Sequence, residues 1–311
     1  MQKCSLYFVV CFFLQTTWYV DAQSVTIFTL SDFELKEGVK SCLVSTSYGQ
    51  EDYEFNKNGL LTQSVTRYNE KDYDIVYYKY ANGNLLEKRA ETYRDNVFDP
   101  STSIAHFYTL DTTESKKVTE KVVSYEKELL EQYRYQYDDK DRLAVIVRSN
   151  AEGTDKTVID HTTVKGEETV TWTMNGEPLK SVRTSKQKKA DGTVQKVVLT
   201  KEFLKGEGNR AKEEVFGEEG KLRARQDFRF DTEKNSFVPT VRTTFEYNEQ
   251  GLLMMETAKK GNQVEETKYL YQYDRPEEGN WIKKIITPEN TYTTRKITYY
   301  PESEISVEKE E

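Results

Sequence analysis

A short motif recurs along this chain and restricts the fold more than any other feature of the sequence. Its clearest copy, Phe245 to Leu253, has alternating aromatic residues, an Asn, two polar residues, a Gly and two leucines. Alternation of apolar and polar residues is typical of a half-buried strand. Asn and Gly tolerate the positive φ angles of tight turns. The motif therefore predicts two antiparallel strands joined by a turn.

Versions of this motif follow one another at a regular spacing. Tyr80 lies 25 residues after Phe55, and Tyr273 lies 26 residues after Tyr247. A period of roughly 25 to 30 residues indicates a repeat architecture, in which one unit cannot bury its apolar face alone. A single hairpin is marginal in water, so neighbouring hairpins must pair or stack. We expect an all-β fold of stacked antiparallel β-hairpin repeats that form an elongated, curved open sheet.

The residues on either side of each turn have expected structural roles. The aromatic residue before the turn should pack on the Leu or Trp after it, because the turn places them on facing strands; such a pair contributes about 0.2 to 1 kcal/mol. The glycines of the turns are expected to be structural, because the turns need their backbone freedom. These glycines are Gly59, Gly83, Gly220, Gly251 and Gly279.

The start of the chain has the composition of a secretory signal. Lys3 precedes an apolar run from Leu6 to Leu14, and small residues stand at Val20 and Ala22. This arrangement is typical of a cleaved signal peptide, and the apolar run is shorter than the roughly 20 residues that a spanning helix requires. We expect cleavage after Ala22, export, and no transmembrane segment in the mature chain.

The chain is expected to divide into four parts. These are a signal peptide (1–22), an N-terminal cap segment (23–50), the hairpin repeat domain (51–300) and an acidic tail (301–311). Within the cap segment, residues 24–30 are expected to form a strand and residues 31–34 a short helical turn. The pattern is interrupted between residues 94 and 120, which we interpret as a longer loop or a degenerate repeat, and in the insertion Arg275 to Glu278.

Composition limits the classes of partner. Charged residues make up 32% and aromatic residues 13% of the chain, as expected for strands with one wet face, and the net charge is −8. That charge argues against nucleic acid or an anionic membrane as partner, because both attract clusters of Lys and Arg. After cleavage Cys42 is the one remaining cysteine, so an internal disulfide is excluded and a buried position is expected.

No arrangement of residues indicates catalysis. His106 and His161 are the two histidines of the chain, and they lie far apart in sequence. Asp138, Asp139 and Asp141 are interpreted as turn formers. The sequence has neither a phosphate-binding Gly-rich loop nor a nucleophile elbow. We therefore expect no catalytic residues, no cofactor and no metal site.

Two rows of tyrosines are the candidate binding residues. Strict alternation places the side chains of each row on one face of a strand, where they can contact a sugar ring or a protein. The alternative is that they form the core of a sheet that has few leucines and isoleucines. The rows are Tyr133, Tyr135 and Tyr137, and Tyr269, Tyr271 and Tyr273.

The motif resembles the YD repeats of RHS-type bacterial proteins. The resemblance rests on Tyr135 to Leu143, Phe245 to Leu253, and Tyr271 to Asp274 with Gly279 to Trp281. It spans most of the chain, although Asp141 stands where the family has Gly and Asn replaces Asp in several copies. The resemblance implies a sheet of β-hairpins, residence at the bacterial surface or envelope, and a binding or scaffolding role.

These observations favour an exported, non-catalytic repeat protein of the bacterial cell envelope, located in the periplasm, at the cell surface or outside the cell. Its expected partner is an envelope protein or a glycan that binds through the sheet. Two alternatives are a purely structural or assembly scaffold and a carbohydrate-active enzyme. The enzyme alternative requires a cleft with two carboxylates about 5 to 10 Å apart.

Overall fold

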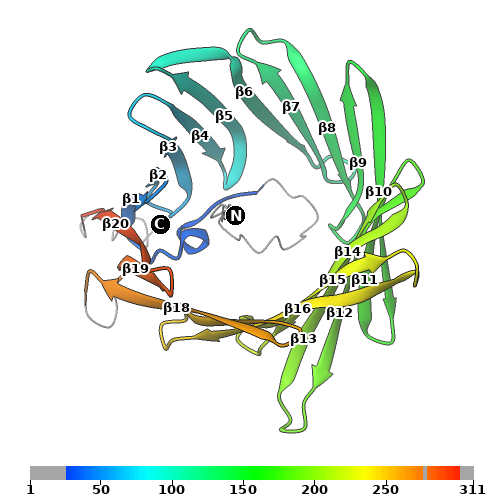
Figure 1. Ribbon diagram of the computed structural model, residues 1–311. Coiled ribbons are helices and arrows are strands. Elements are labelled where there is room, and N and C mark those ends of the chain that lie inside the picture. Colours follow the sequence, from blue (N-terminus) through cyan, green and yellow to red (C-terminus); the bar gives the residue numbers. More distant parts are fainter. Residues whose placement is uncertain (1–25, 276–278, 302–311) are drawn as a thin grey trace, which may run out of the picture.

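The computed structural model describes residues 26–275 and 279–301, which form one sheet around a short N-terminal segment (Figure 1). A short 3-10 helix, η1 (Leu30–Phe33), precedes the strands. The strands in chain order are β1 (Val39–Thr46), β2 (Gly49–Phe55), β3 (Leu61–Arg67), β4 (Tyr73–Ala81), β5 (Asn84–Arg94), β6 (Val97–Asp111), β7 (Lys117–Ser124), β8 (Leu129–Tyr137), β9 (Leu143–Asn150), β10 (Gly153–Val164), β11 (Glu167–Met174), β12 (Glu177–Lys188), β13 (Val194–Leu204), β14 (Glu207–Phe216), β15 (Leu222–Asp231), β16 (Ser236–Tyr247), β17 (Leu253–Lys260), β18 (Gln263–Tyr273), β19 (Trp281–Thr287) and β20 (Thr291–Tyr299).

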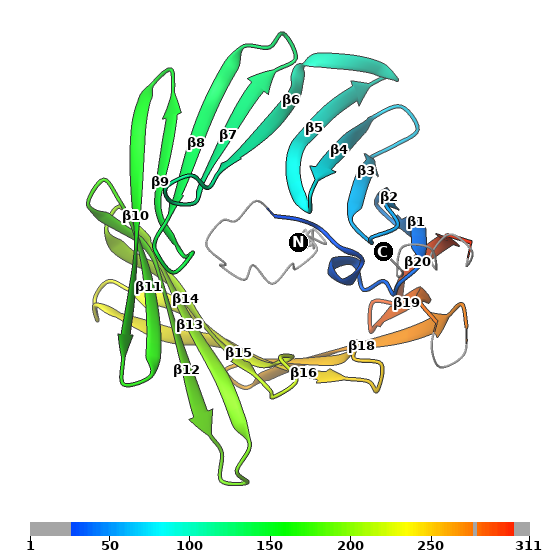
Figure 2. The same cartoon turned by 180° about the vertical axis from the view of Figure 1, so that it is seen from behind.

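The sheet is a closed antiparallel meander. Each strand pairs with the next, and β1 pairs with both β2 and β20, for example through Cys42 opposite Tyr53 and opposite Ile297. The all-β prediction with antiparallel hairpins is therefore confirmed. The expected open, elongated sheet is wrong, because the two edge strands pair and close the sheet into a barrel (Figure 2). Closure satisfies the backbone N–H and C=O groups that an open edge leaves unpaired.

The motif forms a five-residue loop held by its Asx residue. In the loop between β16 and β17, Asn248 N–H donates to the Leu252 carbonyl (2.9 Å) and Leu252 N–H donates to Asn248 Oδ1 (2.8 Å). The loops that begin at Asn56 and Asp138 repeat both bonds. The Asx side chain thus replaces a backbone partner inside the turn. Because turns alternate between the ends of a meander, these loops share one end of the barrel, here called the motif rim.

Gly occupies the fourth position of the loop for a conformational reason. Gly251 has a φ of 83° and Gly59 has a φ of 74°, the left-handed region that a Cβ disfavours. Asp141 takes the same position in its loop with a φ of 60°. Gly279 differs from these, since a Cβ there would overlap the Asp274 carboxylate and the Arg275 backbone.

The predicted cross-strand pairs are confirmed in each copy of the motif. A register shift follows each turn, and it places the aromatic residue opposite the apolar residue that begins the next strand. The pairs are Phe55 with Leu61, Tyr80 with Leu85, Tyr137 with Leu143, Phe216 with Leu222, Tyr247 with Leu253, and Tyr273 with Trp281. Tyrosine hydroxyls add bonds between neighbouring strands. Those of Tyr80 and Tyr247 donate to the carbonyls of Leu61 (2.7 Å) and Leu222 (2.9 Å).

The N-terminal segment packs inside the barrel against β1, β2, β3, β4 and β20. Its Phe33 is buried and contacts the rings of Tyr53 (4.5 Å between centroids) and Phe55 (5.3 Å). Backbone bonds join Leu30 N–H to the Gly59 carbonyl (3.0 Å) and Leu61 N–H to the Phe28 carbonyl (2.9 Å). The inner face of the sheet is therefore the face that carries Tyr53 and Phe55.

A second buried cluster lies on strands β7 to β11. Leu143 is fully buried there, and large side chains surround it. The cluster consists of Val118, Tyr135, Tyr137, Leu143, Ile159 and Trp172. Large rings on neighbouring strands of one face bury one another, so this part of the sheet forms a core of its own.

Several expectations for single segments need correction. Residues 39–46 of the expected cap segment form β1, because this stretch supplies the strand that closes the barrel. The expected strand at 24–30 is wrong in its described part, where Thr29 makes an isolated bridge to Leu60. Residues 94–120 contain β6 and the start of β7, so a degenerate hairpin describes them better than a loop. Asp99 to Ser103 form an irregularity in β6 around Pro100. The signal peptide, residues 276–278 of the insertion and residues 302–311 of the tail lie outside the described residues.

Candidate functional site

Both predicted tyrosine rows lie on the inner face of the barrel. Tyr133, Tyr135 and Tyr137 belong to β8, and Tyr269, Tyr271 and Tyr273 belong to β18. Tyr135 and Tyr137 are buried, whereas the other four are half-buried. The structure thus brings each row together on one strand and does not bring the two rows into one cluster.

The row on β8 adjoins the most polar cluster of the inner face. Phe28 of the N-terminal segment contacts Tyr78 (6.1 Å between ring centroids), and Tyr78, Lys88 and His106 follow one another as register partners across β4, β5 and β6. His106 therefore lies on the inner face. Its neighbours form the group that we call the histidine cluster, defined as His106, Tyr108, Glu120, Tyr133 and Tyr135.

Glu120 is the centre of the histidine cluster. Its Oε1 lies 2.7 Å from His106 Nδ1 and accepts a bond from the Tyr108 hydroxyl (3.1 Å). Its Oε2 accepts a bond from the Tyr135 hydroxyl (2.6 Å). The side chain of Glu120 is 12% exposed and that of His106 is 20% exposed. Both carboxylate oxygens are thus engaged, while the imidazole ring retains some exposure on the inner face.

The contacts of Glu120 fix its ionisation. Burial raises the pKa of its carboxyl, but the hydrogen bonds from His106 and Tyr135 outweigh burial and hold the pKa below its usual value. Burial and the bond to Glu120 raise the pKa of Tyr135, and burial and the Glu120 charge raise that of Tyr108. The cluster therefore holds an ionised carboxylate among neutral hydroxyls at neutral pH.

A second acidic group extends the cluster along β8. The Tyr133 hydroxyl donates to Glu131 Oε2 (2.6 Å), and Arg148 forms an ion pair with Glu131. The hydrogen bond from Arg148 lowers the pKa of Glu131. Arg148 Nε is buried and has no hydrogen-bond partner in the described structure. The rings of Tyr133 and Tyr135 lie nearly parallel, with centroids 6.2 Å apart.

The row on β18 adjoins a different group, the anchor cluster, defined as Glu34, Tyr271, Trp281, Lys284 and Arg295. Trp281 is buried, and its Nε1 donates to Glu34 Oε2 (2.9 Å). The guanidinium of Arg295 lies 3.4 Å from the centroid of the Trp281 ring and donates to the Phe33 carbonyl (2.7 Å). Burial lowers the pKa of both Lys284 and Arg295. This cluster holds the N-terminal segment in place.

The remaining candidate residues have structural contacts. Asp138 Oδ2 accepts bonds from Arg142 (2.6 and 2.8 Å) within its loop, and Asp141 pairs with Lys116 (3.0 Å). His161 lies near the carbonyl of Leu143 (3.0 Å from Nε2). Cys42 is buried as a free thiol, and burial raises the pKa of that thiol to about 11. These side chains stabilise turns and core.

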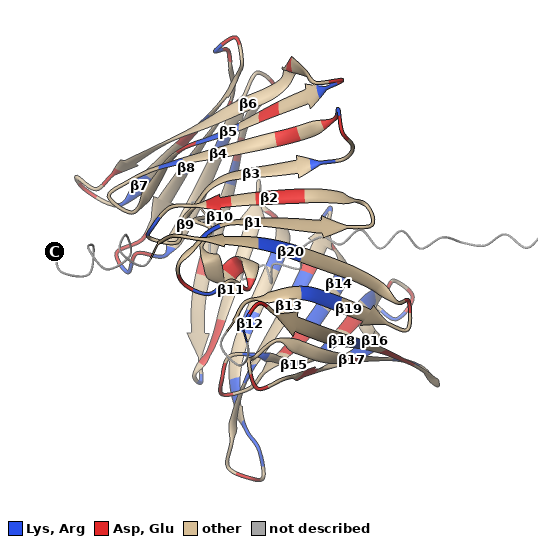
Figure 3. Ribbon diagram, turned by 90° about the vertical axis from the view of Figure 1, so that its left-hand side faces the viewer, with Lys and Arg blue, Asp and Glu red and all other residues tan. Residues whose placement is uncertain are grey.

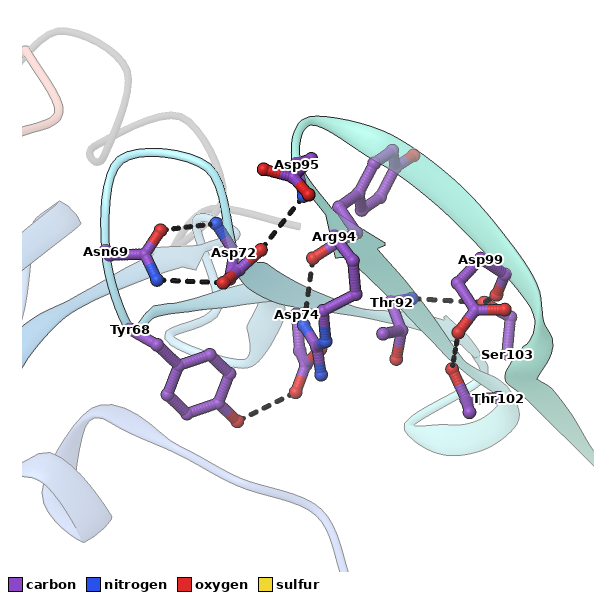
Figure 4. A network of polar contacts seen from close by, with 11 residues as sticks. Tyr68, Asn69, Asp72, Asp74, Thr92, Arg94, Asp95, Asp99, Thr102 and Ser103 are labelled. Atoms are coloured by element: carbon purple, nitrogen blue, oxygen red, sulfur yellow. Dashed lines mark hydrogen bonds and ion pairs between the residues drawn. The ribbon is translucent and has the colours of Figure 1, made fainter.

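A polar network on the rim opposite the motif rim joins two turns (Figure 4). Arg94 and Tyr68 donate to Asp74 (3.2 and 2.8 Å), and Asp95 N–H donates to Asp72 Oδ1 (2.9 Å). A hydrogen bond from Asn69 lowers the pKa of Asp72. The carboxylates of this network accept hydrogen bonds from backbone and side-chain groups. These bonds join the turn between β3 and β4 to the turn between β5 and β6.

Within residues 26–275 and 279–301, no group of three or more His, Cys, Asp or Glu side chains is placed to hold a metal ion. In the same residues no helix has the length and apolarity needed to cross a membrane. No protein-family model matches the chain, and neither does any curated protein.

The sequence pattern predicts two of the five residues of the histidine cluster, and it does not predict the other three as site residues. Tyr133 and Tyr135 were predicted from alternation, and His106 was set aside because the other histidine is distant. Glu120 and Tyr108 had no signal of their own. Tyr108 and Glu120 are register partners on β6 and β7. To predict their contact from the sequence, one would need the exact register between these two strands.

Proposed function

We propose that this protein is a non-catalytic binding protein of the bacterial cell envelope, and that its partner binds on the inner face at the histidine cluster. Export is supported by the composition of residues 1–22, and envelope residence by the resemblance to YD repeats. Of the two partner classes expected, we favour a glycan. The favoured site combines half-buried rings with fixed polar groups, the combination that recognises sugars.

One observation carries this proposal. The tyrosine rings of β8 and the His106 ring share one face with an ionised carboxylate whose partners are all supplied by neighbouring strands. The hydrogen bonds fix the orientation of each ring before any partner arrives, which lowers the ordering cost of binding.

The ionisation of the two carboxylates supports a role in binding over a role in catalysis. A general acid in a glycosidase needs a raised pKa. The pKa values of Glu120 and Glu131 are instead lowered by the hydrogen bonds that they accept. Both groups are therefore poor proton donors near neutral pH, and the site offers fixed acceptors instead.

A glycan array followed by calorimetry tests the proposal. We expect the wild-type protein to bind defined oligosaccharides, and the Tyr133→Ala and His106→Ala variants to bind them at least about tenfold more weakly, the loss of roughly 1.4 kcal/mol. Tyr77→Ala is the matched control, because Tyr77 is a half-buried tyrosine that pairs with Arg89 on the outer face.

Three outcomes would contradict the proposal. Binding that is equally weak in the Tyr77→Ala control would place the glycan elsewhere. Turnover of a bound oligosaccharide, with loss of turnover in Glu120→Gln, would favour a carbohydrate-active enzyme. Absence of binding to every glycan, with normal folding, would favour a scaffold.

A further inference from the structure

One hairpin of this acidic protein carries a net positive charge. Residues 180–201, in β12, β13 and the loop between them, contain seven basic side chains and a single acidic one, Asp191, for a net charge of +6. The whole chain carries −8, so the remainder carries −14. The basic residues are Lys180, Arg183, Lys186, Lys188, Lys189, Lys196 and Lys201. The total charge of the chain conceals this cluster.

This hairpin extends beyond its neighbours in each view of the barrel, and Lys and Arg mark its length in Figure 3. Lys186, Lys188 and Lys189 are exposed near its end, and within the described residues none of the three forms a salt bridge. Asp191, at the tip, accepts bonds from Thr193 (2.6 and 2.9 Å). The charge of these three lysines is therefore presented to solvent.

Two of these lysines lie side by side on one wall of a cleft. Lys186 and Lys196 are register partners on β12 and β13, and like charges placed directly opposite destabilise a sheet. The cleft has a volume of about 340 Å³, and its lining consists of Lys186, Val194, Lys196, Phe216, Gly217, Glu218 and Gly220. This volume is at the lower end of the range for small-molecule sites, roughly 300 to 1,000 Å³.

The wall of the cleft opposite the hairpin belongs to the β14–β15 loop. A Cβ at Gly220 would meet no atom within 4 Å, so this side of the cleft is open. Phe216 supplies an apolar ring, with Lys196 Nζ 5.7 Å from its centroid. The one carboxylate of the lining, that of Glu218, accepts a bond from Val194 N–H (3.0 Å). The cleft is therefore lined by two ammonium groups, by apolar surface, and by one carboxylate that accepts a hydrogen bond from a backbone N–H.

We infer that this cleft binds an acidic sugar unit of a short anionic oligosaccharide, with its carboxylate between Lys186 and Lys196. Ammonium groups favour carboxylates through charge-assisted hydrogen bonds, and a ring placed on Phe216 and Val194 covers apolar surface. The site is separate from the histidine cluster and goes beyond the function proposed above.

The shape and the distribution of charge favour a short oligosaccharide over two other anionic partners. A membrane surface is flat and cannot enter a cleft between two loops. A nucleic-acid duplex needs an extended basic track, whereas the rest of this chain carries −14 and repels a long polyanion. A short acidic oligosaccharide can contact the hairpin alone.

Binding of galacturonate oligomers to the full-length protein tests the inference, with neutral galactose oligomers as the comparison ligand. We expect the acidic oligomer to bind, the neutral one to bind at least about tenfold more weakly, and affinity to fall as salt rises from about 50 mM to about 500 mM. The double variant Lys186→Gln/Lys196→Gln is expected to lose at least about tenfold in affinity. Lys140→Gln/Lys165→Gln is the matched control, because it removes the same charge from two exposed loops of the motif rim.

The same measurements identify results that would overturn the inference. Equal affinity for the acidic and neutral oligomers, or an unchanged affinity in the Lys186→Gln/Lys196→Gln variant, would contradict it. Tighter binding to phosphatidylglycerol vesicles or to duplex DNA through the same lysines would replace the oligosaccharide with that partner. The two lysine variants keep the histidine cluster intact, so loss of the inner-face glycan in Tyr133→Ala and loss of the acidic oligomer here are independent results.

Discussion

Two parts of the inner face use similar residues for different purposes. In the anchor cluster, Trp281 and Arg295 direct their donors to a separate segment, at Glu34 and at the Phe33 carbonyl. In the histidine cluster, the partners of Glu120 come from strands of the sheet itself. The anchor cluster therefore holds a separate segment of chain on the inner face, whereas in the part of the chain that the structure describes the histidine cluster is held by strands of the sheet. The same kinds of side chain thus hold a separate segment in one region and brace neighbouring strands in the other.

The largest effect is expected from Trp281→Ala in the anchor cluster. Trp281 is 3% exposed and contacts Tyr271 and Arg295, so its removal creates a cavity and leaves Glu34 without its donor. We expect a loss of about 4 kcal/mol in the free energy of unfolding, measured by denaturant titration. Limited proteolysis should also cleave near residues 28–35 sooner. If the Trp281→Ala variant is as stable as the wild type and is cleaved near residues 28–35 no sooner, then the anchor cluster does not hold the N-terminal segment.

The counterpart in the histidine cluster is Glu120→Ala. Removal of this carboxylate leaves Tyr135, Tyr108 and His106 without their shared partner. The expected loss is about 3 kcal/mol, with no change in proteolysis of the N-terminal segment. Equal exposure of that segment in both variants would show that the clusters act as one unit.

Acid should weaken the histidine cluster through the same carboxyl. The pKa of Glu120 is lower in the folded protein than in the unfolded chain, so its contribution is complete above pH about 4.5 and is lost as the pH falls through the folded pKa. We expect the Glu120→Gln variant to lose less stability between about pH 5 and about pH 3 than the wild type. Parallel curves for the two proteins in urea titrations would contradict this assignment.

Two opposite substitutions at the fourth position of the motif-rim loops should have smaller effects on stability. Gly251→Val should cost about 2 kcal/mol, because a β-branched residue is strained at a φ of 83°. Asp141→Gly should add about 0.5 to 1 kcal/mol by relieving a φ of 60°, reduced slightly by the loss of the exposed pair with Lys116. Thermal unfolding of both variants measures the effect. Changes of the same sign would show that the two loops are not equivalent.

Sequence alone predicted the hairpins because their causes are local. Asx and Gly define each turn, and alternation defines the faces, so pairs such as Phe55 with Leu61 followed directly. Closure depends on β1, a strand without the motif whose partner β20 lies more than 240 residues away in the chain. The histidine cluster depends on register between β6, β7 and β8, where a shift of one residue would move Glu120 to the outer face. Neither property is encoded within a single repeat.

The pairing of β1 with β20 has a consequence for how this chain folds. An open array of hairpins can form from any point and lengthen one unit at a time. A closed ring requires two segments from opposite ends of the chain to meet, and contacts between such distant residues slow folding. The seam should therefore be the last pairing to form and the one on which cooperative unfolding depends. Removal of a single internal hairpin would shorten the circumference and require every remaining strand to adjust its tilt before β1 could meet β20, whereas a substitution within a repeat acts on one turn or one pair of strands.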